Sequence, residues 1–372
     1  MCLPHLYVAH VERNFSLYSP SIITILTSYT PLFYLYAVSK QRFIDILKDL
    51  QSSPETHHKQ NLLFRFENTQ EAAYHNAIVL EQFNFNVSEA ILAQSHSQVM
   101  FGSEFKHPNQ LQELLQDHPR WEKFKNILLF GATFPLTPIS HQDRLRDLDF
   151  HAKRGNHQSA IKNKQVLDKL INDDIVKGYA LPLPLQLYKY IPNASIAPLG
   201  CQEQETINEQ GIHIPKFRLT HDQSFPGPSG LSVNLRVEKE KLPPCMYSFV
   251  LSRILHYIVD LRKRHPTRKI FLCKFDLDSA YRRCHLSGTT ATECLTIYDE
   301  KLIMALRLTF GGSPCPPMWG YISDTIIDIG NSLIQNEFWD HEEFFDPISN
   351  QLQVENCLPI SIPFHQAKDL AV

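Results

Sequence analysis

The chain has 372 residues, of which 43% are hydrophobic and 20% charged, and its formal net charge is −3. This composition is typical of a globular protein with room for two domains, and it excludes a fibrous or disordered chain. Because the net charge is slightly negative, no basic field covers the whole molecule, and contact with nucleic acid requires local basic patches.

The eight cysteines include no Cys-x-x-Cys pair and no close Cys/His quartet, so we do not expect a zinc site. Several of them alternate with apolar residues between positions 245 and 315, a pattern typical of reduced, buried thiols. We therefore expect an intracellular protein, cytoplasmic or nuclear, that is not secreted.

One apolar stretch, residues 21–38, is a candidate membrane span. It is interrupted by Pro31 and contains five Ser or Thr residues, and it lacks the basic segment and cleavage site of a signal peptide. We interpret it as a buried strand or helix and expect no contact with a membrane.

Helical patterns dominate residues 1–150. A helix starting at Pro108 places three leucines on one face, and an aromatic and apolar run follows over residues 121–134. Nothing in this region has catalytic spacing, so its role stays open. The charged stretch over residues 144–157 predicts a domain boundary within it.

Strands and helices mix after that boundary. The strongest amphipathic helix carries Val166, Leu167, Leu170, Ile171, Ile175 and Val176 at helical spacing. Residues 179–233 predict a small, irregular antiparallel sheet, and a second amphipathic helix over 246–261 precedes a basic run. Strands over 270–275 and 298–308 and a helix over 318–333 follow. The expected fold class is α+β, with an antiparallel sheet packed on helices.

The segment KFDLDSAYRRCHL carries the first chemical signal. Asp276 stands at the end of a predicted strand, and Tyr281 follows five residues later. Carboxylates fixed at strand ends are what Mg²⁺ needs to align phosphoryl transfer. Taken alone, however, this is a weak signal, because strand-end Asp residues are common as helix caps.

A second block, LRLTFGGSPCPPMWG, lies downstream. It predicts a turn at Phe310 and Gly311, followed by a helix that begins at Pro316 or Pro317. The two glycines allow the backbone to approach a ligand closely.

These blocks resemble the reverse transcriptases of retroelements, whose palm reads Asp-x-x-x-Ala/Gly-Tyr and then Leu-x-Phe-Gly-x-x-x-Ala-Pro. The matching text is DLDSAY and LTFGGSPCP, with Cys315 where the family usually has Ala. A third block, Lys-aromatic-Arg with an Asp four residues after the Arg, matches KFRLTHD at residues 216–222. The resemblance covers residues 159–372. The amino-acid sequence of these blocks is similar to that of the polymerases of DIRS-like or related retrotransposons, a class of transposable element.

The resemblance implies a right-hand polymerase, with fingers over residues 151–235 and a partial palm over 236–372. It implies template-directed deoxynucleotidyl transfer by an RNA-directed DNA polymerase with Mg²⁺. The implied partners are an RNA or DNA template-primer and a dNTP. The oligomeric state stays open.

The resemblance also assigns residue roles around the metal and the sugar. Asp276 would bind both metals, assisted by the backbone carbonyl of Leu277. Tyr281 would lie beneath the incoming sugar and exclude a 2′-hydroxyl. The structural alternatives are a helix-capping Asp and a core aromatic residue.

Further roles concern the phosphates and the template. By resemblance, Lys216 and Arg218 would bind the triphosphate, and Phe310 and Gly311 would line the nucleotide and template pocket. A solvated basic pair and a plain turn are the alternatives.

A local basic patch could contact the nucleic-acid backbone. Residues 262–283 contain eight Lys or Arg against two Asp, a balance of +6. The residues assigned to backbone contact are Arg262, Lys263, Arg264, Arg268 and Lys269. A solvated helix end would look similar.

The second carboxylate motif of the family, Tyr/Phe-x-Asp-Asp, is not found after Leu333. We therefore expect a truncated chain without the second Asp pair, thumb or ribonuclease H domain, and inactive alone. The competing interpretations are a non-catalytic nucleic-acid-binding remnant and an unrelated interaction protein.

Overall fold

A computed structural model describes residues 63–94, 98–207, 211–244, 250–270 and 277–335. All of these residues belong to one compact unit. The apolar stretch at 21–38, the predicted strand at 270–275 beyond its first residue, and Asp276 lie outside the described residues. Within the part that is described, no helix is long and apolar enough to cross a membrane.

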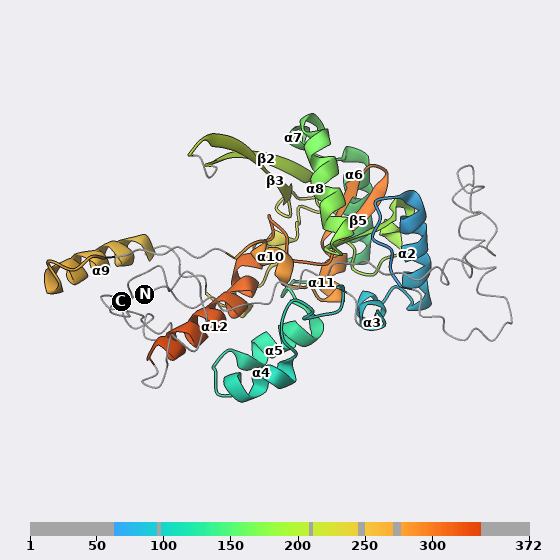
Figure 1. Cartoon of the computed structure of the whole chain (residues 1–372). Coiled ribbons are helices and arrows are strands. Elements are labelled where there is room, and N and C mark those ends of the chain that lie inside the picture. The colour runs from blue at the N-terminus through green and yellow to red at the C-terminus, as the bar shows by residue number, and fades with distance from the viewer. Residues whose placement is uncertain (1–62, 95–97, 208–210, 245–249, 271–276, 336–372) are drawn as a thin grey trace, which may run out of the picture. The chain divides into compact units, whose positions relative to one another are not determined.

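Helices make up the described part of the N-terminal region (Figure 1). Pro108 occupies the first turn of its helix, as predicted, because a residue there needs no N–H partner. The helices are α2 (Gln70–Gln82), α3 (Val87–Leu92), α4 (Pro108–Leu115), α5 (Trp121–Phe130) and α6 (His141–Arg154).

The charged stretch over residues 144–157 lies mostly within α6 rather than in a linker. The Ser140 hydroxyl accepts a hydrogen bond from the Asp143 N–H at the start of α6, and Gly155 ends it with a φ of 71°. Arg144 extends from α6 to Glu293, 3.4 Å away. Arg144 therefore contacts another element, which the charge pattern of the sequence does not reveal.

The predicted antiparallel sheet after residue 179 is present as a hairpin of β2 and β3, in which Gln202 lies opposite Arg218. The elements of this part of the chain are α7 (Gln158–Lys162), α8 (Lys164–Val176), β1 (Ala180–Pro184), η4 (Leu185–Lys189), β2 (Leu199–Ile207), β3 (His213–His221), η5 (Asn234–Arg236) and η6 (Lys239–Lys241).

A second antiparallel sheet has the strand order β1-β5-β4, with β4 at Leu295–Tyr298 and β5 at Lys301–Ala305. The edge position of β1 explains its two prolines, because an edge strand needs ladder hydrogen bonds on one side only. The carbonyl of Pro182 accepts a hydrogen bond from Asn76 of α2 at 3.0 Å. The N-terminal helices therefore pack directly on this sheet.

The remaining helices are α9 (Val250–Arg264), α10 (Ala280–Arg283), α11 (Gly288–Thr292) and α12 (Cys315–Gln335). The two predicted helices over 246–261 and 318–333 correspond to α9 and α12. Taken together, the described residues form a mixture of helices and antiparallel sheet, which confirms the α+β class. The division into fingers and palm stays a prediction.

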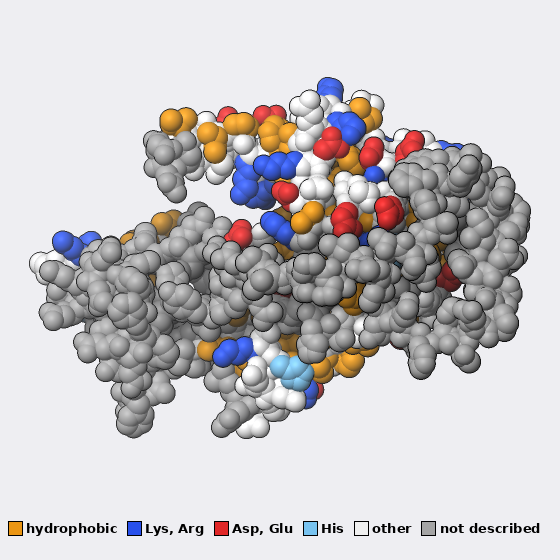
Figure 2. Space-filling view, turned by 45° about the vertical axis from the view of Figure 1, so that its right-hand side comes forward, with side chains coloured by type: hydrophobic (Ala, Val, Ile, Leu, Met, Phe, Trp, Pro, Cys, Tyr) orange, Lys and Arg blue, Asp and Glu red, His pale blue; other side chains and the backbone are white. Residues whose placement is uncertain are grey.

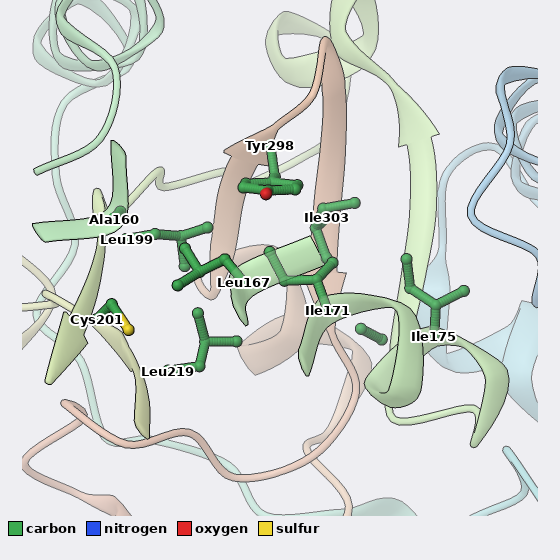
Figure 3. Packing of buried hydrophobic residues seen from close by; sticks show 10 residues of the cluster. Ala160, Leu167, Ile171, Ile175, Leu199, Cys201, Leu219, Tyr298 and Ile303 are labelled. Carbon is green, nitrogen blue, oxygen red and sulfur yellow. The ribbon is translucent and has the colours of Figure 1, made fainter. Parts of the chain in front are cut away.

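The largest side chains of one core cluster come from α8 and from both sheets (Figure 3). Leu167, Ile171 and Ile175 form the buried face of α8, and each such side chain contributes about 1.5–3 kcal/mol on burial. They pack against Leu199, Cys201, Leu219, Tyr298 and Ile303. The predicted apolar face is wrong at Val176, which is 60% exposed because it lies about 100° around the helix from Ile175.

The described cysteines match the expectation of reduced, buried thiols. Cys201, Cys284, Cys294 and Cys315 are all free and buried. Burial raises the pKa of the Cys315 thiol to about 11, so this thiol is protonated and unreactive at neutral pH.

Candidate nucleotide-binding site

The three sequence blocks meet at the side chain of Phe310. The Tyr281 ring lies 5.2 Å from the Phe310 ring, centroid to centroid, with 30° between their planes. The guanidinium carbon of Arg218 lies 5.6 Å from the Phe310 ring centroid. Phe310 is partly exposed, at 39%. We call Arg218, Tyr281, Phe310 and Gly311 the candidate pocket.

The backbone of the third block joins the second block at His221. The His221 N–H donates to the carbonyl of Phe310 at 2.8 Å. Gly311 has a φ of 122°, and a Cβ at this position would lie only 1.8 Å from the His221 carbonyl oxygen. A residue other than glycine would therefore displace the turn or the end of β3.

Asn234 holds the other side of this turn. Its Nδ2 donates to the Gly311 carbonyl at 2.7 Å, and its Oδ1 accepts from the Ser313 N–H at 2.7 Å. Sequence reasoning did not identify Asn234, because it stands in a Pro- and Gly-rich loop with no pattern of its own. Only the fold brings it to the turn.

Arg282 fixes the segment that carries Tyr281. One guanidinium nitrogen donates to the Leu308 carbonyl at 2.9 Å, and another forms an ion pair with Asp174 of α8 at 2.6 Å. Burial raises the pKa of the Asp174 carboxyl, against the opposing effect of Arg282. In the sequence, Arg282 stands out only as part of the basic patch over residues 262–283.

His221 is buried beneath the turn. Neither ring nitrogen has a hydrogen-bond partner among the described residues. Burial, with a smaller contribution from Arg282, lowers the pKa of His221 to about 3. The ring is therefore neutral at physiological pH, and it adds no positive charge to the candidate pocket.

Lys216 and Arg218 are both exposed on β3. They stand two residues apart and therefore point to the same face of the hairpin, as do the Gln204 and Gln202 side chains paired with them on β2. The acids of β2, Glu203 and Glu205, belong to the opposite face. The basic face therefore has no carboxylate of the hairpin on it, and Figure 2 shows Lys and Arg side chains gathered beside the hairpin.

The predicted metal ligands are only partly described. Leu277 and Asp278 are exposed, and Asp276 lies outside the described residues. Among the residues that are described, no three His, Cys, Asp or Glu side chains form a group that could hold a metal ion. These residues alone do not make a two-metal site.

The basic run at the end of α9 is exposed throughout. Arg264 forms an ion pair with Asp260 at 2.6 Å, and Arg262 donates to the carbonyls of Pro266 and Arg268 at 3.1 and 2.9 Å. The residues of the run are Arg262, Lys263, Arg264, Arg268 and Lys269.

Comparisons with protein-family models, with curated proteins and with solved structures find no match for this chain. A family assignment therefore rests on the three motifs and on the way the fold brings them together.

Proposed function

We propose that the chain contains the nucleotide-binding part of a reverse-transcriptase-type polymerase domain of retroelement origin. The observation that carries this proposal is the placement of the Phe310 ring beside both Tyr281 and Arg218. These residues come from three separate blocks. The same three blocks resemble the family in amino-acid sequence, order and spacing. Coincidental motifs would have no reason to meet at one ring.

The chemistry of the candidate pocket suits a deoxynucleoside triphosphate. Arg218 and Lys216 present cations on a hairpin face without carboxylates, and an arginine fork matches phosphate oxygens well. Tyr281 offers a ring against which a sugar can lie, and Gly311 permits close approach of the backbone. An RNA or DNA template-primer would be the second ligand.

Mg²⁺ belongs to the proposed function through the resemblance. Asp276 and the Leu277 carbonyl would hold it, together with carboxylates other than those described. When bound, the metal would supply charge stabilisation for phosphoryl transfer.

Equilibrium binding of a fluorescent dNTP to the full chain tests the proposal. We expect Arg218→Ala to weaken binding about 10- to 100-fold, because a hydrogen bond to a charged group contributes about 1.5–3 kcal/mol. Glu205→Ala, on the opposite face of the same hairpin, is the matched control and should bind as the unsubstituted chain does. Equal affinities in all three proteins, or no binding by the unsubstituted chain, would refute the proposal.

The exposed basic run of α9 favours a second candidate, nucleic-acid binding without catalysis. Each cation that contacts a phosphate contributes about 0.7–0.9 to the slope of log K against log salt. Arg262→Ala combined with Lys263→Ala should therefore lower this slope by about 1.4–1.8. Nucleic-acid binding with no dNTP binding would favour this candidate, and neither activity would favour an unrelated interaction protein.

A further inference from the structure

The N-terminal helical region, for which the sequence gives no role, contacts the segments that carry Tyr281 and Phe310 through Glu104. One carboxylate oxygen of Glu104 lies 3.5 Å from Arg283, and the other lies 3.7 Å from Arg307. Arg283 comes two residues after Tyr281, and Arg307 comes three residues before Phe310. A single carboxylate therefore joins the two segments that carry the aromatic pair.

Arg307 depends on this contact because it is completely buried, with 0% of its surface exposed. A buried charge costs several kcal/mol unless it is paired, and Glu104 is the one carboxylate that the described residues place within ion-pair distance. Burial lowers the pKa of Arg307 to about 10, while Glu104 acts in the opposite direction. The carbonyl of Gln98 accepts a further hydrogen bond from Arg307 at 2.6 Å.

The loop that carries Glu104, residues 98–105, also contacts His285, which lies between the two segments in the sequence. The His285 Nε2 is 3.4 Å from the Gln98 carbonyl and 3.5 Å from the Ser103 hydroxyl. The Phe101 ring lies edge-on to the imidazole, with 6.1 Å between centroids. Residues 98–105 thus contact several residues of the segment that continues from Tyr281 into the core.

A second group of contacts reaches α12, the helix after the Phe310 turn. Arg120 forms an ion pair with Asp324, and His118 Nε2 lies 3.1 Å from the Asp328 carboxylate. Both acids are at most 9% exposed, so these contacts are shielded from solvent screening. The α4–α5 region and the loop before it therefore touch the chain on both sides of the aromatic pair.

Ordinary packing would place apolar contacts anywhere along the interface. Here the charged contacts of residues 98–120 go to residues 283, 307, 324 and 328, which flank Tyr281 and Phe310 in the sequence. We propose that residues 98–120 position Tyr281 and Phe310, so that the N-terminal region is a structural part of the nucleotide pocket. Glu104 is the central positioning residue, and this inference rests on the proposed function.

The test compares dNTP and rNTP affinity in the full chain and in Glu104→Gln. Because Tyr281 would exclude the 2′-hydroxyl, displacing it should lower the ratio of the two affinities about three- to tenfold, the usual size of an indirect coupling. A simple loss of folded protein would lower both affinities equally. Glu122→Gln, at an exposed position of α5, is the control and should keep the ratio of the unsubstituted chain.

A charge exchange covers the case in which Glu104→Gln does not fold. Arg120→Asp and Asp324→Arg should each lower the ratio, and the double variant should restore it. The inference is overturned if Glu104→Gln folds and keeps the dNTP-to-rNTP affinity ratio of the unsubstituted chain. It is also overturned if both single variants keep this ratio while the double variant restores only the stability that they lose. The proposed function would survive those results, whereas it fails with the inference if the unsubstituted chain binds neither nucleotide.

Discussion

The turn of the candidate pocket depends on Gly311. Gly311→Ala would bring a Cβ within 1.8 Å of the His221 carbonyl oxygen, so we expect a large loss of stability and of dNTP affinity. Gly230→Ala is the control, because Gly230 also has a positive φ but nothing lies within 4 Å of a Cβ there. It should cost only about 1–2 kcal/mol. Urea unfolding measures both, and equal losses would show that the close approach at Gly311 is unimportant.

His221 predicts a specific loss of stability in acid. Its pKa is about 3 in the folded chain and near 6.5 when unfolded, so below pH 6.5 the unfolded chain takes up the proton first. The contribution of neutral His221 to the free energy of unfolding is therefore fully present above pH 6.5 and is lost as the pH falls toward 3. We expect a loss of about 2 kcal/mol between pH 6.5 and pH 5.

His221→Leu should remove that part of the acid sensitivity while leaving the backbone bond to Phe310 in place. Burial also lowers the pKa of His285, so some acid sensitivity should persist. Unfolding free energies at pH 7 and pH 5 stay above the carboxylate range and isolate the histidines. Identical pH dependence in both proteins would contradict the assignment of a buried, neutral His221.

Between elements, Arg236 and Glu293 form a buried ion pair. Both nitrogens of the Arg236 fork lie 2.8 Å from the Glu293 carboxylate, and both residues are buried. Burial raises the pKa of Glu293, but hydrogen bonding and charge from Arg236 and Arg144 outweigh it and lower the pKa overall. The carboxylate therefore stays charged inside the protein and requires its partners.

Arg236→Met should cost about 3–5 kcal/mol, because it leaves a buried charge with an incomplete set of partners. Arg264→Met is the control, since its ion pair with Asp260 is more than half exposed and should contribute little. Chemical denaturation compares the two. A loss in Arg236→Met no larger than in the control would show that the network is not structural.

The elements with a local signal were predictable from the sequence. Periodicity and turn residues predict four of them: the Pro108 start of α4, the buried face of α8, the β2–β3 hairpin and α12. The pairing of β1 with β5 was not predictable, because the partners are far apart in the sequence. The residues missed at the site share this cause: Asn234, Arg282 and Glu104 act through contacts that exist only after folding.

For the molecule as a whole, α8 connects the hairpin to the β1-β5-β4 sheet. Leu167 is fully buried there, so Leu167→Ala should cost about 2–5 kcal/mol and weaken dNTP binding only through the loss of folded protein. Val176→Ala, on the exposed side of the same helix, should change little. Thermal unfolding measures both, and a small effect at Leu167 would mean that the two sheets do not share this core.

A structure of the full chain with a bound dNTP tests the central claim most directly. The account predicts the triphosphate against Arg218 and Lys216, and the deoxyribose against the Tyr281 ring beside Phe310. A dNTP bound elsewhere, or none at a saturating concentration, would contradict the claim that the three sequence blocks form a nucleotide pocket.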